Sequence, residues 1–171
     1  MDLIALIRDI PDFPEPGIVF KDITPVLADP SAFGQLIDLI ADPHRDARVT
    51  KVAGIEARGF TLAAPVAEKL EAGFIPLRKP GKLPYRTIRE EYSLEYGADA
   101  LEMHVDAVDQ GERVLVVDDV IATGGTAAAA IRLLRGAGAE VVGCSVFIEL
   151  GFLNGRAMIG DVPFHAIHRV D

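Results

Sequence analysis

Apolar residues recur along the chain in short continuous runs, each followed by polar or small residues. The runs at 51–55, 73–77, 114–117 and 141–150 are rich in Val, Ile and Leu, which is typical of strands buried on both faces. Apolar residues at helical spacing fill 30–42, 61–70 and 127–135 between them. This alternation predicts an α/β fold with a mostly parallel, twisted sheet flanked by helices, closed by a last strand at 163–170.

Two further segments are expected to cover the carboxyl-terminal edge of that sheet. The first, about residues 1–35, is called the hood segment: Met1 to Ile10 has helical spacing, and the prolines after it predict an ordered loop. A short β-like run, Ile18 to Ile23, follows that loop. The second segment, about residues 79–97, is a basic loop followed by a polar stretch, 85–97, that predicts a long β-ribbon or mobile flap outside the core.

The stretch at 113–126, RVLVVDDVIATGGT, carries the strongest chemical signal. A small-residue turn, Ala122 to Thr126, opens an alanine-rich helix, where backbone N–H groups and the helix dipole favour a dianionic phosphate. The adjacent carboxylates of Asp118 and Asp119 are expected about the length of one ribose from that phosphate. There they could accept hydrogen bonds from vicinal hydroxyl groups or help to position Mg²⁺. A solvated strand tip is the alternative for this aspartate pair. Neither GxxxxGK[ST] nor GxGxxG is present in this stretch.

Cations mark a second anion-binding candidate. Arg58 follows a buried strand at a strand-to-helix turn, and the loop 78–84, RKPGKLP, holds three more cations. A structural ion pair between Glu56 and Arg58 is one alternative, and a solvated loop tip is the other. Phe20 offers a ring face for stacking a flat base, although its apolar neighbours favour packing in the core.

Length and charge narrow the class of protein. The 171 residues fit one domain, 1–171, and a net charge of −9 argues against non-specific binding of nucleic acid. One cysteine, Cys144, lies in an apolar run and is expected in the core; it allows no internal disulfide, which fits a reducing cytoplasm. His104 is expected to be non-catalytic, since the four histidines lack metal-ligand spacing. The chain has no signal pattern and no apolar run near the ~18 residues of a membrane span, so no membrane partner is expected.

Taken together, these stretches resemble the adenine phosphoribosyltransferases, a branch of the type I phosphoribosyltransferases. The signature at 114–126 marks the superfamily, which binds phosphoribosyl pyrophosphate (PRPP). The adenine branch is marked by FPEPGIVF at 13–20, RKPGKLP at 78–84 and SLEYG at 93–97. The resemblance extends from about Ile10 to Val170, and it departs at Lys21, where the family often has arginine.

The resemblance implies a type I phosphoribosyltransferase fold and Mg²⁺-dependent transfer of a 5-phosphoribosyl group from PRPP to adenine, giving AMP and pyrophosphate, in purine salvage. It also implies a homodimer. The residues that would bind the 5-phosphate are Ala122, Thr123, Gly124, Gly125 and Thr126. Those that would bind ribose, and help to hold Mg²⁺, are Asp118 and Asp119. Those that would bind pyrophosphate are Glu56, Ala57, Arg58, Arg78, Lys79 and Lys82. Those that would bind adenine are Val19, Phe20, Lys21 and Leu150. The catalytic residues would be Glu95 and Tyr96, with Glu95 handling a proton of the purine.

Two other functions stay open. The same chemistry on hypoxanthine, guanine or xanthine is one, although Phe20 and Glu95 argue against it. A PRPP- or purine-sensing regulator without turnover is the other, but such regulators usually carry an added basic DNA-binding module, and this chain is acidic.

Overall fold

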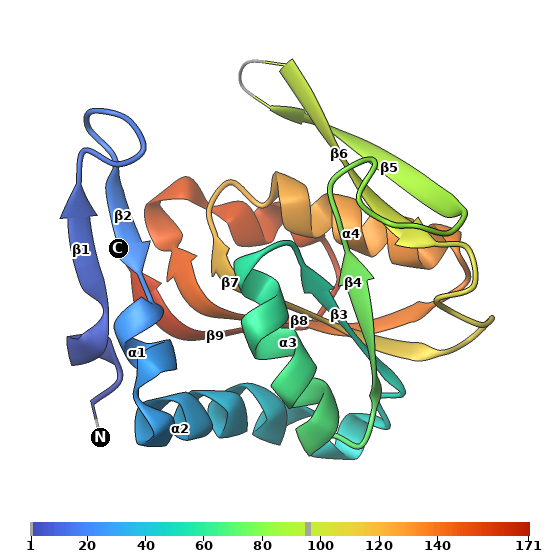
Figure 1. The fold of residues 1–171 in the computed structure, drawn as a ribbon, viewed down its shortest axis with the longest axis horizontal. Helices are drawn as coiled ribbons and strands as arrows, with labels where there is room; N and C mark the ends of the chain where they lie inside the picture. Colours follow the sequence, from blue (N-terminus) through green and yellow to red (C-terminus); the bar gives the residue numbers. More distant parts are fainter. Residues whose placement is uncertain (1, 95–96) are drawn as a thin grey trace.

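The computed structural model describes residues 2–94 and 97–171, which contain a central sheet of five parallel strands. In sheet order the strands are β4 (Gly73–Leu77), β3 (Lys51–Ile55), β7 (Arg113–Ile121), β8 (Glu140–Leu150) and β9 (Phe164–Val170). Figure 1 shows α2 (Pro30–Ala41) and α3 (Arg58–Lys69) on one face of the sheet and α4 (Gly125–Gly136) on the other. The predicted α/β fold with a parallel sheet flanked by helices is confirmed.

The order of the strands changes direction between β3 and β7. The chain leaves β3 through α3 to reach β4 on one side, whereas it leaves β7 through α4 to reach β8 on the other. Right-handed crossovers that run in opposite directions place their helices on opposite faces. A crevice for a ligand therefore forms beyond the carboxyl ends of these two strands.

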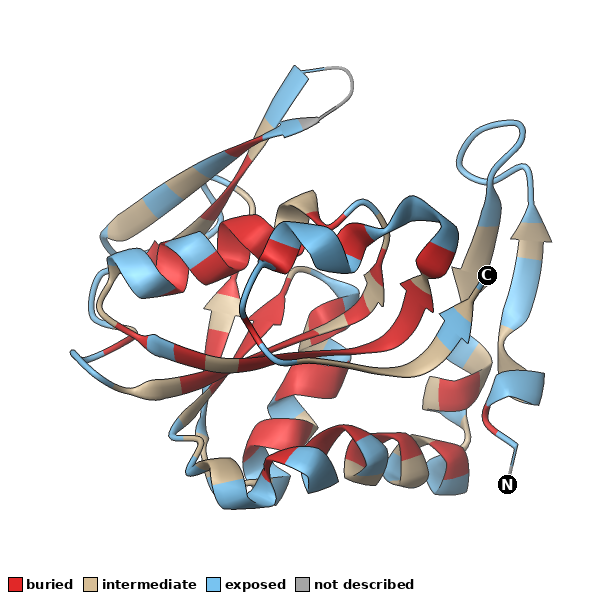
Figure 2. Ribbon diagram, turned by 180° about the vertical axis from the view of Figure 1, so that it is seen from behind, coloured by how far each residue is buried: buried red, intermediate tan, exposed pale blue. Residues whose placement is uncertain are grey.

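Two hydrophobic clusters, one on each face of the sheet, hold the layers together. In β7, Val114 and Val116 pack on the α4 side, Leu115 and Val117 pack on the α2 and α3 side, and all four are fully buried. Figure 2 shows the buried residues concentrated in the sheet and on the inner sides of the helices. Within the described part of the chain, no helix combines the length and the apolar character needed to cross a membrane.

Three predicted boundaries are wrong by a few residues. β7 continues to Ile121 because its last residues pair with β8, so the aspartate pair lies in the strand and not after it. α3 begins at Arg58 instead of Thr61, which places Pro65 inside the helix. α4 begins at Gly125. Several of the extra residues, including Arg58, Asp118 and Asp119, line the ligand crevice, so these stretches lack the apolar periodicity that the prediction relied on. By contrast, α2 begins as predicted, with Asp29 Oδ1 accepting from the N–H groups of Ser31 and Ala32 at 2.9 and 2.8 Å.

The helix predicted over Met1 to Ile10 is wrong. The described residues form a short 3-10 helix, η1 (Ile4–Leu6), and then β1 (Arg8–Pro11), which pairs antiparallel with β2 (Val19–Asp22). Leu6 and Ile7 pack against the hydrophobic cluster that contains α2, so the apolar spacing serves packing without a regular helix. A short helix, α1 (Thr24–Ala28), links β2 to α2 and was not predicted.

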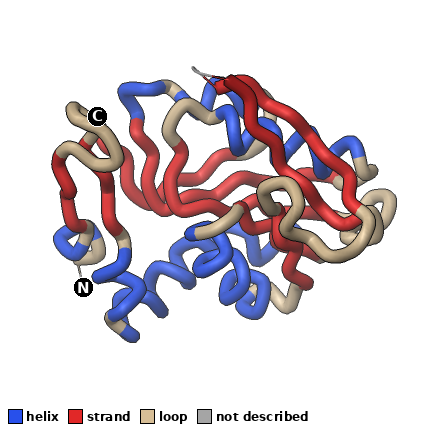
Figure 3. The backbone as a smooth tube through the Cα atoms, turned by 45° about the horizontal axis from the view of Figure 1, so that its top comes forward, coloured by secondary structure: helices blue, strands red, loops and turns tan. Residues whose placement is uncertain are grey.

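A second antiparallel hairpin, β5 (Thr87–Leu94) with β6 (Gly97–His104), is the predicted β-ribbon. Figure 3 shows it as a long ribbon on the side of the sheet opposite α2 and α3. Its inner face belongs to the core, since Tyr92, Leu101 and Met103 are all at most 7% exposed. The prediction that the stretch at 85–97 stays outside the core is therefore wrong at Tyr92.

Candidate active site

A pocket of about 280 Å³ opens beyond the carboxyl ends of β3 and β7, where the order of the strands changes direction. Two continuous stretches and two single residues line it: Ile55 to Arg58, Asp118 to Ala127, Lys79 and Val146. The predicted phosphate turn, both aspartates and most of the predicted pyrophosphate residues therefore face one cavity.

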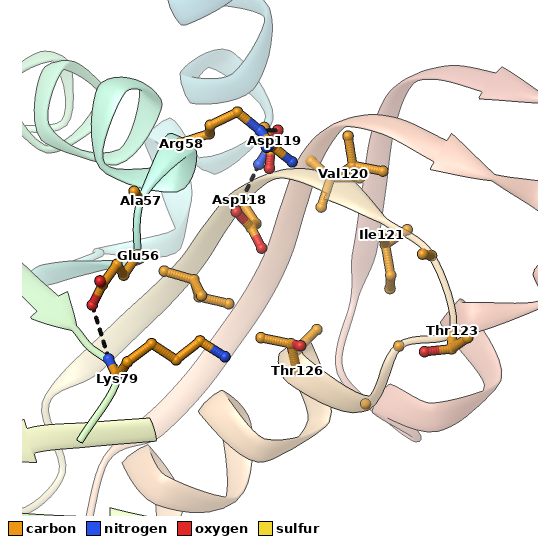
Figure 4. A pocket seen from close by; sticks show the side chains of 16 residues that line it. Glu56, Ala57, Arg58, Lys79, Asp118, Asp119, Val120, Ile121, Thr123 and Thr126 are labelled. Atoms are coloured by element: carbon orange, nitrogen blue, oxygen red, sulfur yellow. Dashed lines mark hydrogen bonds and ion pairs between the residues drawn. The ribbon is translucent and has the colours of Figure 1, made fainter. Parts of the chain in front are cut away.

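The two aspartates of β7 take different environments because neighbours in a strand point to opposite sides. Asp119 is 4% exposed and forms an ion pair with the Arg58 guanidinium group. The Asp118 carboxyl group accepts the N–H of Asp119 at 2.9 Å and points into the pocket (Figure 4). Burial raises the pKa of Asp118 well above its ordinary value of 3.8, and the neighbouring charge of Asp119 adds to the shift. The solvated strand tip is therefore wrong.

The turn after β7 leads directly into α4. Gly124 has a φ of +86°, a left-handed conformation that side chains disfavour, and it precedes the first residue of the helix. Thr123, Gly125 and Thr126 all line the pocket, so the open N–H groups of the first helical turn and two hydroxyl groups reach the same space. The first turn of α4 contains no acidic residue. This end of the pocket suits a phosphate group.

Glu56 lies at the other end of the pocket and binds three residues of the basic loop. Its side chain is 9% exposed and pairs with Arg78 at 3.3 Å and with the Lys82 ammonium group, while the N–H of Lys79 donates to it at 2.9 Å. Burial alone would raise the pKa of Glu56, but the hydrogen bonds from Lys82 and Lys79 outweigh it, and the pKa is lowered. The alternative of a Glu56–Arg58 pair is wrong, since Arg58 pairs with Asp119. The tip of the basic loop is exposed, but its cations are paired with carboxylates.

The segment predicted to bind the base lies beside this pocket without lining it. Phe20 is half-buried outside both hydrophobic clusters, so the expected core position is wrong. Its ring packs edge-to-face with Phe13 at 5.2 Å, and the Arg58 guanidinium group lies 4.9 Å from its centroid. The Lys21 ammonium group binds Asp9 at 2.7 Å. Val19, which is half-exposed, and Leu150, which is half-buried at the end of β8, also lie outside the pocket lining.

The remaining predictions concern Glu95, Tyr96 and Cys144. Glu95 and Tyr96 lie outside the described residues, so their catalytic role stays a prediction. Cys144 is fully buried, and burial raises the pKa of its thiol to about 12, which confirms that it is a packing residue.

A supporting network beside the phosphate turn was not predicted from the sequence. Glu149, near the end of β8, is fully buried and binds the guanidinium group of Arg156, with Nε at 2.6 Å, and Arg169 at 3.3 Å. Arg156 belongs to η4 (Gly155–Ile159), which follows η3 (Gly151–Leu153). Hydrogen bonds from Arg156 lower the pKa of Glu149 despite its burial.

Lys79 has partners that were also not predicted. Its ammonium group donates to the Tyr92 hydroxyl at 2.9 Å and forms an ion pair with Asp99. The pairing register of the hairpin explains why both groups reach Lys79. Leu94 pairs with Gly97, and this register places Tyr92 directly opposite Asp99.

Comparison with known proteins agrees with this geometry. Residues 23–156 match the phosphoribosyl transferase domain family. An adenine phosphoribosyltransferase from Myxococcus xanthus is 62% identical over 93% of this chain and 86% of its own length. The crystal structure of the adenine phosphoribosyltransferase from Rhodothermus marinus is 54% identical, with a TM-score of 0.95 over 98% of this chain and 96% of its own. The Saccharomyces cerevisiae enzyme, solved with an imino-altritol bisphosphate and adenine, is 36% identical, with a TM-score of 0.93 over 97% of this chain and 96% of its own.

The matched region contains β3, α3, β4, the hairpin, β7 and α4, so it includes every segment that lines the pocket. The type I phosphoribosyltransferase fold expected from the sequence is confirmed by these structures. With identities far above what a shared fold alone would require, and with coverage of nearly the whole chain, the protein belongs to the adenine phosphoribosyltransferase family.

Proposed function

We propose that this protein transfers the 5-phosphoribosyl group of PRPP to adenine, giving AMP and pyrophosphate, as a step of purine salvage. One observation supports this most: a single pocket has a helix N-terminus at one end, two carboxylates in the middle and a cluster of cations at the other end. A ribose with a phosphate on C5 and a diphosphate on C1 has the same order of groups.

The turn Ala122 to Thr126 binds the 5-phosphate in this proposal. The helix dipole and open N–H groups of α4 attract the dianion, and the hydroxyl groups of Thr123 and Thr126 add donors. Asp118 and Asp119 accept from the ribose hydroxyl groups. These two carboxylates are too few to hold Mg²⁺ alone but fit a site completed by oxygens of PRPP. When bound, Mg²⁺ supplies positive charge close to the pyrophosphate.

Pyrophosphate binds the cationic end of the pocket. Arg58, Lys79, Arg78 and Lys82 donate to its oxygens, and the turn at Glu56 and Ala57 holds these groups together. As the bond between C1 and the pyrophosphate oxygen breaks, negative charge grows on the leaving group. Cations fixed in advance stabilise that charge more in the transition state than in the ground state.

Adenine binds between Phe20 and Leu150, with the backbone of Val19 and Lys21 reading its edge. The structure solved for the yeast relative contains adenine, which supports a purine site in the family. N9 of adenine forms the new bond to C1 and loses its proton. We assign that proton to the Glu95 carboxylate, with Tyr96 beside it, as general acid–base catalysis.

The test is a screen of bases with PRPP and Mg²⁺, following pyrophosphate release. We expect turnover with adenine and little with hypoxanthine, guanine or xanthine. A preference for hypoxanthine would overturn the assignment of adenine. Folded protein that binds PRPP but releases no pyrophosphate with any base would favour a sensing role.

We infer further that the protein is a homodimer in the cytoplasm. Large apolar side chains remain exposed on the single chain, including Phe152 at 66% and Met158 at 56%, which supports a partner surface. The lone cysteine is consistent with a reducing compartment. Light scattering coupled to gel filtration tests the dimer, and a monomer at micromolar concentration would contradict it.

A further inference from the structure

Lys79 connects the pocket to the β5–β6 hairpin. Its backbone N–H binds Glu56 after β3, while its side chain extends across the pocket toward Thr126 in Figure 4. The ammonium group ends at Asp99 and Tyr92, which stand opposite each other on β6 and β5. One residue thus contacts both the wall of the ligand pocket and the hairpin.

The Asp99 carboxylate is held in position to bind that ammonium group. One of its carboxylate oxygens accepts the N–H of Ala100 at 2.8 Å, which fixes the side chain, and the other binds Lys79 and lies 3.4 Å from the Tyr92 hydroxyl. The side chains of Lys79 and Asp99 are 34% and 31% exposed, so the pair is accessible to an incoming ligand. Hydrogen bonds with Asp99 and Tyr92 outweigh the desolvation of Lys79 and raise its pKa, which keeps the ammonium group charged.

Each of the four cations assigned to pyrophosphate already has a carboxylate partner. Arg58 pairs with Asp119 on β7, and Arg78 and Lys82 pair with Glu56 after β3. Both of those carboxylates come from the ends of central strands. Asp99 differs because it comes from the hairpin, so an exchange at Lys79 changes a contact between the pocket and the hairpin.

We infer that Asp99 is a positioning residue that holds Lys79 in the pocket and competes with a diphosphate for its ammonium group. The inference rests on the proposed function. The Asp99 carboxylate offers the lysine another partner, which the ammonium group must give up when it binds the diphosphate, and this competition weakens binding. Asp99 therefore limits the affinity for pyrophosphate and for the diphosphate end of PRPP, which favours release of the product.

The experiment is calorimetric titration of inorganic pyrophosphate with Mg²⁺ into the full chain and its variants. Asp99→Asn keeps the shape of the side chain and removes its charge, and we expect pyrophosphate to bind about two- to fivefold tighter, the size typical of a partly exposed charge pair. Asp99→Ala should change binding in the same direction, which guards against an effect peculiar to asparagine. Glu91→Gln is the matched control. It removes one charge from the same hairpin on a side chain that is 69% exposed and paired with Arg89, and binding should not change.

The same titration on a Lys79→Met background separates competition from a general effect of charge. We expect Asp99→Asn to have no effect there, since the inference requires the lysine. Unchanged or weaker binding by Asp99→Asn in the wild-type background would overturn the inference, as would a tightening that persists without Lys79. Wild-type protein that neither binds pyrophosphate nor turns over adenine would overturn the proposed function and, with it, this inference. Normal turnover with an unaffected Asp99→Asn variant would overturn this inference alone.

Discussion

The backbone of Gly155 lies directly against the backbone of Gly124, with no space for a side chain on either residue. A β-carbon on Gly124 would overlap the carbonyl oxygen of Gly155, and one on Gly155 would overlap that of Ala122. The first residue of η4 is therefore the surface on which the phosphate turn rests, although the two segments are separated along the chain by α4 and β8.

Gly155→Ala should disturb this contact. Because two backbones must move apart, we expect the free energy of unfolding to fall by about 1–3 kcal/mol, as overpacking does in cores. The KM for PRPP should rise while the KM for adenine stays unchanged, since the proposed function assigns only the 5-phosphate to the displaced turn. Gly34→Ala in α2 is the control: no atom lies within 4 Å of its added β-carbon, and alanine should stabilise the helix by about 0.5–1 kcal/mol. Equal KM values for PRPP in wild type and Gly155→Ala would contradict the supporting role.

Arg156→Met should be more damaging than its exposed position suggests. The change leaves the fully buried Glu149 with Arg169 alone, at 3.3 Å. Because removal of one partner from a buried ion pair typically costs about 3 kcal/mol, we expect the free energy of unfolding to fall by that amount, and urea unfolding is the measurement. The exposed pair of Arg135 with Asp161, at 3.1 Å, provides the comparison. Arg135→Met should change stability by less than about 1 kcal/mol, and similar losses in the two variants would argue against a special role for Glu149.

Stability should fall as the solution becomes mildly acidic, in part through His44. This residue is 8% exposed and its Nε2 lies 2.7 Å from Ser145 Oγ. Burial lowers its pKa below 6.5, and the nearby His165 adds to the shift. The unfolded chain therefore takes up a proton near pH 6.5 before the folded protein does, so the contribution is complete above that pH and is lost below it. Urea unfolding between pH 7.5 and 5.5 should show a shallower decline for His44→Gln than for wild type. Parallel curves would exclude His44 as a source of the pH dependence.

Asp118→Asn tests the ribose contact. Because burial raises the pKa of Asp118, the wild-type affinity for PRPP with Mg²⁺ should increase with pH as this carboxyl group loses its proton. Asparagine cannot ionise, so the variant should bind about tenfold more weakly at high pH, the loss expected for a charged hydrogen bond, and should lack that dependence. A pH profile of KM for PRPP is the measurement, and an unchanged profile would move the ribose contact elsewhere.

Glu95→Gln tests the proton transfer. We expect kcat to fall by about 10²- to 10⁴-fold, the range for loss of a general acid or base, with little change in the dissociation constant of PRPP. Glu91→Gln, which changes a carboxylate on β5 that is 69% exposed, should retain wild-type kcat. Equal losses in kcat and in PRPP binding for Glu95→Gln would leave that residue a structural role only.

The sequence predicted the central sheet and the small-residue turn after β7 because both are local patterns. Val114 to Val117 form a continuous apolar run because β7 is buried on both faces, and the turn Ala122 to Thr126 follows it directly. The N-terminal strand was missed because β1 is fixed by pairing with β2, including the contact of Asp9 with Lys21. Such pairing leaves no periodic signal in either segment alone.

The partners of the site cations were missed for a similar reason. Lys79 meets Asp99 across 20 residues, and Arg58 meets Asp119 across 61. Composition identified the cations, but their partners depend on strand order and hairpin register, which short-range patterns do not specify. Phe20 illustrates the same limit: its apolar neighbours suggested the core, whereas the fold leaves its ring half-buried beside Arg58.

The adjacency of β3 and β7 also determines when the pocket can exist during synthesis of the chain. Lys51 pairs with Val114, so the turn after β3 meets its counterpart only after the intervening helix, strand and hairpin have emerged. Contacts this distant in sequence form late in folding, since the entropy of closing the long loop opposes them. A nascent chain that ends before α4 contains the cations but no phosphate turn. Under the proposed function, the ability to bind the whole substrate would therefore arise only after β7 has paired with β3 and α4 has begun to form.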